Sequence, residues 1–299
     1  QWNTLSGILE AFQPDVGVIS GWAIPAFNRA ARWIKNAGGT MVCMSDNQWH
    51  GAVKQRLGAV YAKLFFRRRY DAMFVPGERQ RVFARKCGFV GRRVITGMYS
   101  CDWPLYASAH DRREEQFQGR WPEAFVFVGS LIERKGIPEL LQAYGHYRTC
   151  TNSPWELWFV GDGPLAALVE GREGVKNCGF KQPAECAEIL AETGAFLLPS
   201  RSEPWGVVLH EATAAGLPAI CTDQCGSGVD LVTHGYNGYT FEAGAVDHLT
   251  ELMLCLSSKD DAELREMGRR SYELSKQFTP ERWADNLLEG IESLRRMDQ

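Results

Sequence analysis

Short apolar runs alternate along the chain with segments in which apolar residues recur at helical spacing. Such alternation is typical of parallel sheets whose strands are joined by crossover helices. The runs Phe125–Val128 and Phe196–Leu198 contain no polar position, as expected of strands covered by helices on both faces. We therefore predict an α/β fold. The expected strands are Val16–Ser20, Thr40–Met44, Asp71–Val75, Arg93–Thr96, Ala124–Gly129, Glu156–Gly161, Ala195–Pro199 and Ala219–Thr222.

A polar and charged stretch from Cys101 to Pro122 divides these strands into two groups. Because 299 residues are enough for two domains, we predict a first domain over residues 1–110 and a second over residues 122–278. The remaining segment, residues 279–299, is predicted to form a helix over Thr279–Leu294 that packs back toward the first domain. Its apolar stripe consists of Trp283, Leu287, Leu288, Ile291 and Leu294.

The composition, 45% hydrophobic and 23% charged, is that of a globular protein. The net charge of −3 gives no reason to expect a nucleic-acid partner. Nine scattered cysteines without a C-x-x-C spacing argue against a zinc site and a disulfide framework. No apolar run approaches the roughly 20 residues that cross a bilayer. We expect reduced thiols and a cytoplasmic location.

The strongest motif is Pro199–Ala212, which follows a predicted strand and leads into a helix. Gly206 allows a ligand to approach the backbone closely, and the free N–H groups at a helix start attract anions. Glu203 and Glu211 stand eight residues apart, so we expect both to face one crevice. Their carboxylates can accept hydrogen bonds from paired hydroxyls, such as those of a sugar and a ribose.

The Glu203–Glu211 segment resembles the E-x7-E motif of retaining glycosyltransferases of the family 4 type (glycosyl transferases group 1). Those enzymes have the GT-B fold, in which two Rossmann-like domains with parallel sheets face each other across a cleft. The resemblance implies that Glu203 contacts the donor hexose and that Glu211 holds the ribose hydroxyls. It also implies contacts to sugar and diphosphate from the intervening Pro204, Trp205, Gly206 and Val207.

A second motif, Phe127–Gly136, places adjacent cations in a loop after a predicted strand. It resembles the family's G-R-L…K-G loop, which implies that Lys135 binds the diphosphate close to Gly129. A charge-assisted hydrogen bond of this kind is worth roughly 1.5–3 kcal/mol. Ser130 replaces the family's arginine, and Arg134 is an alternative cation. We take Lys135 and Glu203 as the candidate catalytic residues; solvated loop cations are the other interpretation of this motif.

The segment Val175–Phe180 resembles one that passes along the nucleobase in relatives, which makes Gly179 and Phe180 candidate donor contacts. A simple strand and turn is the alternative. In the first domain, Met41–Asp46 resembles a strand that often ends near a histidine, and Ser45 stands at that position. No glycine-rich loop precedes Val16, so we expect the N-terminal domain to be partial.

The segment Lys63–Arg69 mixes basic and aromatic residues. Two interpretations stay open for it. It could make a peripheral membrane contact, or it could be a solvated helix end whose aromatic rings lie in the core.

Taken with the motifs, the resemblance implies a retaining transferase that moves a hexose from a nucleotide-diphosphate sugar to a glycan, lipid-linked or small-molecule acceptor. No D-x-D motif occurs, so we expect neither a metal ion nor another cofactor. Three alternatives remain. The same fold serves nucleotide-sugar epimerases and sugar phosphorylases, a glycosidase could use Glu203 and Glu211 as acid and base, and the protein could bind sugar nucleotides without turnover.

Overall fold

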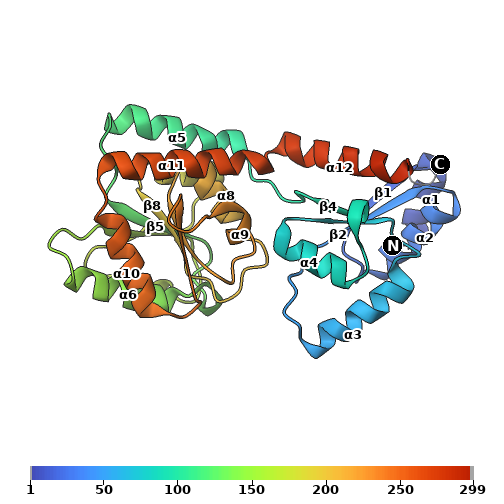
Figure 1. Ribbon diagram of the computed structural model, residues 1–299, viewed down its shortest axis with the longest axis horizontal. Helices are drawn as coiled ribbons and strands as arrows, with labels where there is room; N and C mark the ends of the chain where they lie inside the picture. Colours follow the sequence, from blue (N-terminus) through green and yellow to red (C-terminus); the bar gives the residue numbers. More distant parts are fainter. Residues whose placement is uncertain (1, 297–299) are drawn as a thin grey trace. The chain divides into compact units, whose positions relative to one another are not determined.

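The computed structural model describes residues 2–296 (Figure 1). Its contacts divide the chain into two compact units. Unit 1 consists of Gln1–Tyr99 together with Glu281–Gln299, and unit 2 is Ser100–Pro280. Over the described residues, no helix has both the length and the apolar character that crossing a bilayer requires.

Unit 1 is built on a four-stranded parallel sheet in the order β1-β2-β3-β4. Its strands are β1 (Val16–Ser20), β2 (Thr40–Met44), β3 (Ala72–Val75) and β4 (Val94–Thr96). Its helices are α1 (Trp2–Phe12), α2 (Pro25–Asn36), α3 (Val53–Tyr61), the π turn η1 (Ala62–Phe66), α4 (Glu78–Lys86), η2 (Gly91–Arg93) and α12 (Pro280–Arg295).

The last helix, α12, supplies part of the core of unit 1. Leu287, Ile291 and Leu294 are buried in one cluster with Phe74 of β3. The indole nitrogen of Trp283 donates a hydrogen bond of 2.6 Å to the Met98 carbonyl. The predicted stripe was wrong at one position: Leu288 is 60% exposed. It follows Leu287 by one residue, about 100° around the helix, so it points away from the buried face.

Unit 2 is built on a six-stranded parallel sheet in the order β10-β9-β8-β5-β6-β7. Helices α6 and α10 cover one face, and α5, α8 and α11 cover the other (Figure 1). The strands are β5 (Ala124–Val128), β6 (Glu156–Val160), β7 (Val175–Asn177), β8 (Ala195–Leu198), β9 (Ala219–Thr222) and β10 (Gly238–Phe241). The helices are α5 (Trp103–Phe117), η3 (Glu133–Lys135), α6 (Ile137–Thr149), η4 (Ala166–Leu168), α7 (Pro183–Ala191), α8 (Val207–Ala214), α9 (Gly228–Leu231), α10 (Val246–Ser257), α11 (Asp261–Ser275) and η5 (Lys276–Phe278).

The eight strands predicted from apolar runs are all present, within one residue at either end. The central strands β5, β8 and β9 are almost wholly buried. This explains why their sequences lack the alternation of a half-exposed strand. Two strands at the sheet edges, β7 and β10, were not among these eight, although β7 is the strand of the strand-and-turn alternative given for Val175–Phe180. Neither produces a continuous apolar run, because two of the three residues of β7 are exposed and β10 contains Gly238 and Thr240.

A buried arginine on α5 joins this helix to the ends of two others. Arg113 is 1% exposed, and its guanidinium donates hydrogen bonds to backbone carbonyls. The acceptors are Leu190, Thr193 (3.3 Å), Ala215 (2.8 Å) and Gly216 (3.3 Å). Helix ends carry carbonyl groups without intrahelical partners. The planar Arg113 guanidinium therefore donates to carbonyl groups at the carboxyl ends of both α7 and α8, and a lysine ammonium cannot do this.

We predict that Arg113→Lys strongly destabilises the protein. The substitution would leave several buried carbonyls unsatisfied, at about 1–3 kcal/mol each. Denaturant unfolding should show a free energy of unfolding lower by about 3 kcal/mol or more. The matched control is Arg112→Lys, since Arg112 is only half-buried and donates to Ser108 of its own helix. Equal stability of the two variants would contradict the role given to Arg113.

Candidate functional site

Unit 2 has a point at which its strand order changes direction. From β5 the chain adds β6 and β7 on one side and then returns to place β8 on the other side of β5. The loops after β5 and β8 therefore follow neighbouring strands on either side of this point. In open α/β sheets, ligands bind at the carboxyl ends of the strands at such a point. Both motifs singled out in the sequence lie in these two loops, η3 after β5 and the Glu203 loop after β8.

A buried ion pair joins the two loops. Lys135 Nζ donates to Glu203 Oε2, and each side chain is only about a tenth exposed. The Arg134 guanidinium lies 4.0 Å from the same carboxylate oxygen and donates 2.6 Å to the Ser202 carbonyl. Burying an isolated carboxylate is costly, so the adjacent cations account for its position. The structure thus brings together Lys135, Arg134 and Glu203, which the sequence placed in one site.

The backbone beside Glu203 is shaped by Gly206, the residue before α8. Gly206 has φ +91°, and a Cβ there would lie 2.9 Å from Glu203 Cγ and 3.2 Å from Cys225 Sγ. A side chain at this position would therefore collide with the Cγ of Glu203 and the thiol of Cys225. The first N–H groups of α8, from Val207, follow directly, and a helix start carries free N–H donors and partial positive charge. Cation, carboxylate and helix start thus meet at one place.

The loop that carries Glu203 is fixed from its other side by the segment after β9. Gly226 N donates to the Glu203 carbonyl (2.9 Å), and Ser227 N donates to the Trp205 carbonyl (2.8 Å). The Trp205 ring is 2% exposed and packs edge-on against Phe278 at 5.3 Å. Because the Trp205 side chain is buried, only the backbone of this predicted donor contact could reach a ligand. Pro204, another predicted contact, is exposed.

The second glutamate of the motif, Glu211, lies on α8 itself, beyond the loop that carries Glu203. Glu211 is hydrogen-bonded to the Tyr106 hydroxyl of α5. Burial raises the pKa of Glu211 to about 7, although the Tyr106 hydrogen bond acts to lower it. Sequence reasoning missed Tyr106, because it lies in the polar stretch that was assigned to the domain boundary. A carboxyl with this pKa changes charge near neutral pH.

Gly129 and Ser130 lie where β5 passes into its loop. Gly129 N donates 2.9 Å to the Val160 carbonyl of β6, and Ser130 is exposed. Gly179 and Phe180 follow β7, two strands away from β5. Gly179 accepts a hydrogen bond of 2.8 Å from Gly161 N, and the Phe180 ring is 68% exposed. The Phe180 ring thus lies largely in solvent beyond the carboxyl end of β7.

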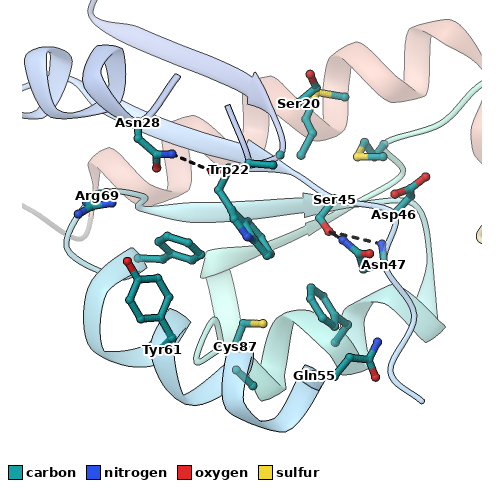
Figure 2. Close-up of a pocket in the computed structure, with 18 of the residues that line it drawn as sticks. Ser20, Trp22, Asn28, Ser45, Asp46, Asn47, Gln55, Tyr61, Arg69 and Cys87 are labelled. Carbon is teal, nitrogen blue, oxygen red and sulfur yellow. Dashed lines mark hydrogen bonds between the residues drawn. The ribbon is translucent and has the colours of Figure 1, made fainter. Parts of the chain in front are cut away.

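Unit 1 contains a cavity of about 800 Å³ at the carboxyl ends of its strands (Figure 2). Trp22 and Tyr61 face it with their rings, and Ser45 and Asp46 follow β2 at its edge. Asp46 accepts a hydrogen bond of 3.1 Å from the Tyr99 hydroxyl. Burial, with the adjacent Asp46 carboxylate, raises the pKa of Tyr99 to about 12. The cavity thus combines aromatic walls with a carboxylate.

Ser45, at the position of the family's histidine, is 6% exposed, and its hydroxyl accepts a hydrogen bond of 3.0 Å from the Asn47 side chain. Among residues 2–296, His, Cys, Asp and Glu side chains form no group of three that could hold a metal ion.

Comparison with known proteins gives one family. The family model of "Glycosyl transferases group 1" matches residues 111–273, which is more than half of the chain. An uncharacterized glycosyltransferase of Methanocaldococcus jannaschii is 32% identical over 165 residues, 52% of this chain and 44% of that protein. The N-acetyl-alpha-D-glucosaminyl L-malate synthase of Bacillus anthracis is 30% identical, over 52% of this chain and 42% of the synthase. The matched part is thus less than half the length of these relatives.

Solved structures agree on the fold. Anabaena HepE in complex with UDP superposes with a TM-score of 0.75 and 17% identity, covering 97% of this chain and 81% of HepE. The pneumococcal O-GlcNAc transferase GtfA in complex with UDP and GlcNAc gives a TM-score of 0.69 and 16% identity, covering 97% and 59%. The predicted GT-B fold, α/β with two parallel sheets, is confirmed. With its family model matched across unit 2, the chain belongs to the glycosyl transferases group 1 family.

Proposed function

We propose that this protein is a retaining glycosyltransferase whose unit 2 binds a nucleotide-diphosphate sugar at the loops after β5 and β8. The observation that carries the proposal is the Lys135–Glu203 pair beside the Gly206 start of α8, at the point where the strand order changes direction. A cation and helix N–H groups suit a diphosphate. A buried carboxylate beside them suits the hydroxyls of the attached hexose.

The arrangement also accounts for how bond cleavage could be accelerated. Negative charge grows on the leaving diphosphate as the bond to the anomeric carbon breaks. The N–H groups of α8 are held by the helix before the reaction, and Lys135 and Arg134 lie beside them, so positive charge is already present where that negative charge develops. Because these groups supply the positive charge, we propose that transfer needs no metal ion or other cofactor. Retention of the anomeric configuration is part of the proposal and rests on the E-x7-E resemblance.

Donor binding would change the partners of the ion pair. The Lys135 ammonium is hydrogen-bonded to Glu203. A diphosphate competes for the Lys135 ammonium, and this releases Glu203 to accept hydrogen bonds from the hexose. Glu211 would hold the ribose, with the base near Gly179 and Phe180. The acceptor, a glycan, a lipid-linked molecule or a small molecule, would occupy the cavity of unit 1.

We propose a cytoplasmic location on the basis of the cysteines. All nine are free thiols, and six of them are buried. Such usage fits a reducing compartment.

We predict that Lys135→Ala weakens the binding of a nucleoside diphosphate by about tenfold or more, the value of one charge-assisted hydrogen bond. Titration calorimetry with UDP and with GDP measures the change. The control is Lys259→Ala, because Lys259 also pairs with a glutamate of unit 2, Glu263, at 3.0 Å. An unchanged affinity in Lys135→Ala would remove Lys135 from the diphosphate site.

We predict that Glu203→Gln abolishes transfer but preserves nucleoside-diphosphate binding. The amide keeps the shape of the side chain, and the loss of the carboxylate frees Lys135 for the phosphate, so affinity should stay equal or rise. Product analysis with nucleotide sugars and calorimetry give the two readouts, and the anomeric configuration of the product tests retention. Glu242→Gln is the control, since Glu242 is an exposed carboxylate after β10 of the same sheet. Normal turnover by Glu203→Gln would overturn the site.

We predict that nucleoside-diphosphate affinity rises from about pH 6 to about pH 8, across the pKa of Glu211 near 7. Below that pKa the carboxyl is protonated and cannot accept hydrogen bonds from both ribose hydroxyls; above it the carboxylate can. The nearby Cys186, Tyr106 and Cys101 have pKa values raised by burial, and that of His210 is lowered to about 4, so none of these changes charge in this range.

The phosphate of the ligand also titrates in this range, so the control is the same pH series with Glu211→Gln. This variant keeps the contribution of the phosphate, and its affinity should therefore change less with pH than that of the unmodified protein. A 2′-deoxynucleoside diphosphate should likewise show a smaller slope with the unmodified protein. Identical pH profiles for the protein and Glu211→Gln would exclude a ribose contact by Glu211.

A further inference from the structure

Helix α3 and the π turn η1 expose large apolar side chains that a globular protein ordinarily buries. We call this surface the α3 face. Its members, with exposed fractions, are Val53 (73%), Leu57 (68%), Val60 (56%), Tyr61 (48%), Leu64 (59%) and Phe65 (47%). Single exposed apolar residues are common, but a contiguous apolar patch marks an interaction site.

The α3 face lies opposite the side by which the helix packs on unit 1. Ala59, Ala62 and Phe66 are buried in the core cluster of the sheet. At about 100° per residue, Val53, Leu57, Val60 and Tyr61 fall within roughly 100° of arc on the other side.

Beyond Tyr61 the π turn, with Arg67 N bonded to the Ala62 carbonyl at 3.4 Å, buries Phe66 while leaving Leu64 and Phe65 outside. The segment therefore has two apolar sides, of which the core uses one.

Cations surround the exposed side. Between residues 48 and 70 the chain has six basic residues and no acidic one, although its net charge is −3. They are Lys54, Arg56, Lys63, Arg67, Arg68 and Arg69, and all but Arg69 are exposed. None of them pairs with a carboxylate in the part of the chain that the structure describes. An apolar stripe flanked by unpaired cations complements a surface that has an apolar interior and anionic groups on its outside.

We propose that the α3 face binds an anionic lipid bilayer. The apolar stripe would enter the boundary between headgroups and acyl chains, and the cations would contact anionic headgroups. A second copy of the chain fits less well, because a two-fold contact through this face would oppose two sets of six like charges. Of the two interpretations of Lys63–Arg69, the exposure of Leu64 and Phe65 favours the membrane contact, whereas Phe66 lies in the core.

The same helix lines the cavity of unit 1 through Lys54, Gly58 and Tyr61, and Figure 2 shows Tyr61 among the lining side chains. If that cavity takes the acceptor, a step that rests on the proposed function, then the acceptor class is lipid-linked. The docking itself requires no catalytic activity, so it can be tested separately.

The test is vesicle flotation with phosphatidylcholine alone and with phosphatidylcholine containing phosphatidylglycerol. The protein should float with the anionic vesicles and remain largely unbound with the neutral ones. Leu57→Glu and Leu64→Glu should each remove most of the binding. The control is Leu288→Glu, which changes a leucine of similar exposure (60%) on α12 of unit 1 and should bind like the unmodified protein.

The cations are tested by Arg67→Ala with Arg68→Ala. A basic residue near an anionic surface contributes about 1 kcal/mol, so binding should weaken roughly fivefold for each one removed. Raised salt should weaken the unmodified protein's binding in the same direction. Arg92→Ala with Arg296→Ala, which removes two exposed arginines elsewhere in unit 1, should have little effect.

Three results would overturn the proposal. The first is no binding, or equal binding to both kinds of vesicle. The second is a lower Tm of Leu57→Glu relative to Leu288→Glu, because it would show that protein covers the face. The third is a dimer in light scattering that Leu57→Glu dissociates. Nucleoside-diphosphate affinity, measured in parallel, should be unchanged in these variants; its absence in all of them would contradict the proposed function and leave the docking result standing.

Discussion

The geometry of unit 2 depends on a carboxylate and a cation that pair where the loop after β5 meets the loop after β8. Glu203 and Lys135 are each about nine-tenths buried. Neither could be buried alone without a large desolvation cost. Their attraction therefore holds the loop after β5 against the loop after β8, and the hydrogen bond from Arg201 N to the Arg134 carbonyl (2.9 Å) closes the backbone beside it. The side chains that we propose to bind the donor are thus also the ones that hold the two loops together.

This dual role constrains the surrounding sequence. Gly136, with φ +73°, has no room for a Cβ, which would collide with the Pro199 carbonyl of the facing loop. Gly206 is similarly confined between Glu203 and Cys225. The loop after β5 can approach the loop after β8 closely because Gly136 carries no side chain where it meets Pro199.

Much of the fold could be predicted from sequence because the central strands are covered on both faces. Strands such as β5 and β8 appear as unbroken apolar runs, and the motifs at their ends directed attention to Lys135 and Glu203. What was missed depends on tertiary contacts. Tyr106 reaches Glu211 from a helix without a clear apolar stripe, in a stretch whose polarity resembles that of a linker. Leu288 fits the apolar spacing but points to solvent.

The cavity of unit 1 could not be found from sequence for a different reason. Its lining comes from the ends of separate strands and from one side of α3, and no local pattern marks these residues as neighbours. The α3 face shows the converse limit, because its residues are periodic and adjacent in sequence. Apolar periodicity indicates which residues share a side of a helix. Only the structure shows which of these sides packs against the core.

The hydrogen bonds of Arg113 between α5 and the ends of α7 and α8 have a consequence for producing unit 2 by itself. A fragment cut immediately before β5 would keep every strand of the six-stranded sheet. It would nevertheless lose Arg113 and expose the carbonyls that this side chain covers. For recombinant expression, the shortest self-sufficient piece should therefore begin ahead of Asp102, whose side chain caps α5. Helix α5 would then stabilise the ends of α7 and α8 from the amino end of that fragment.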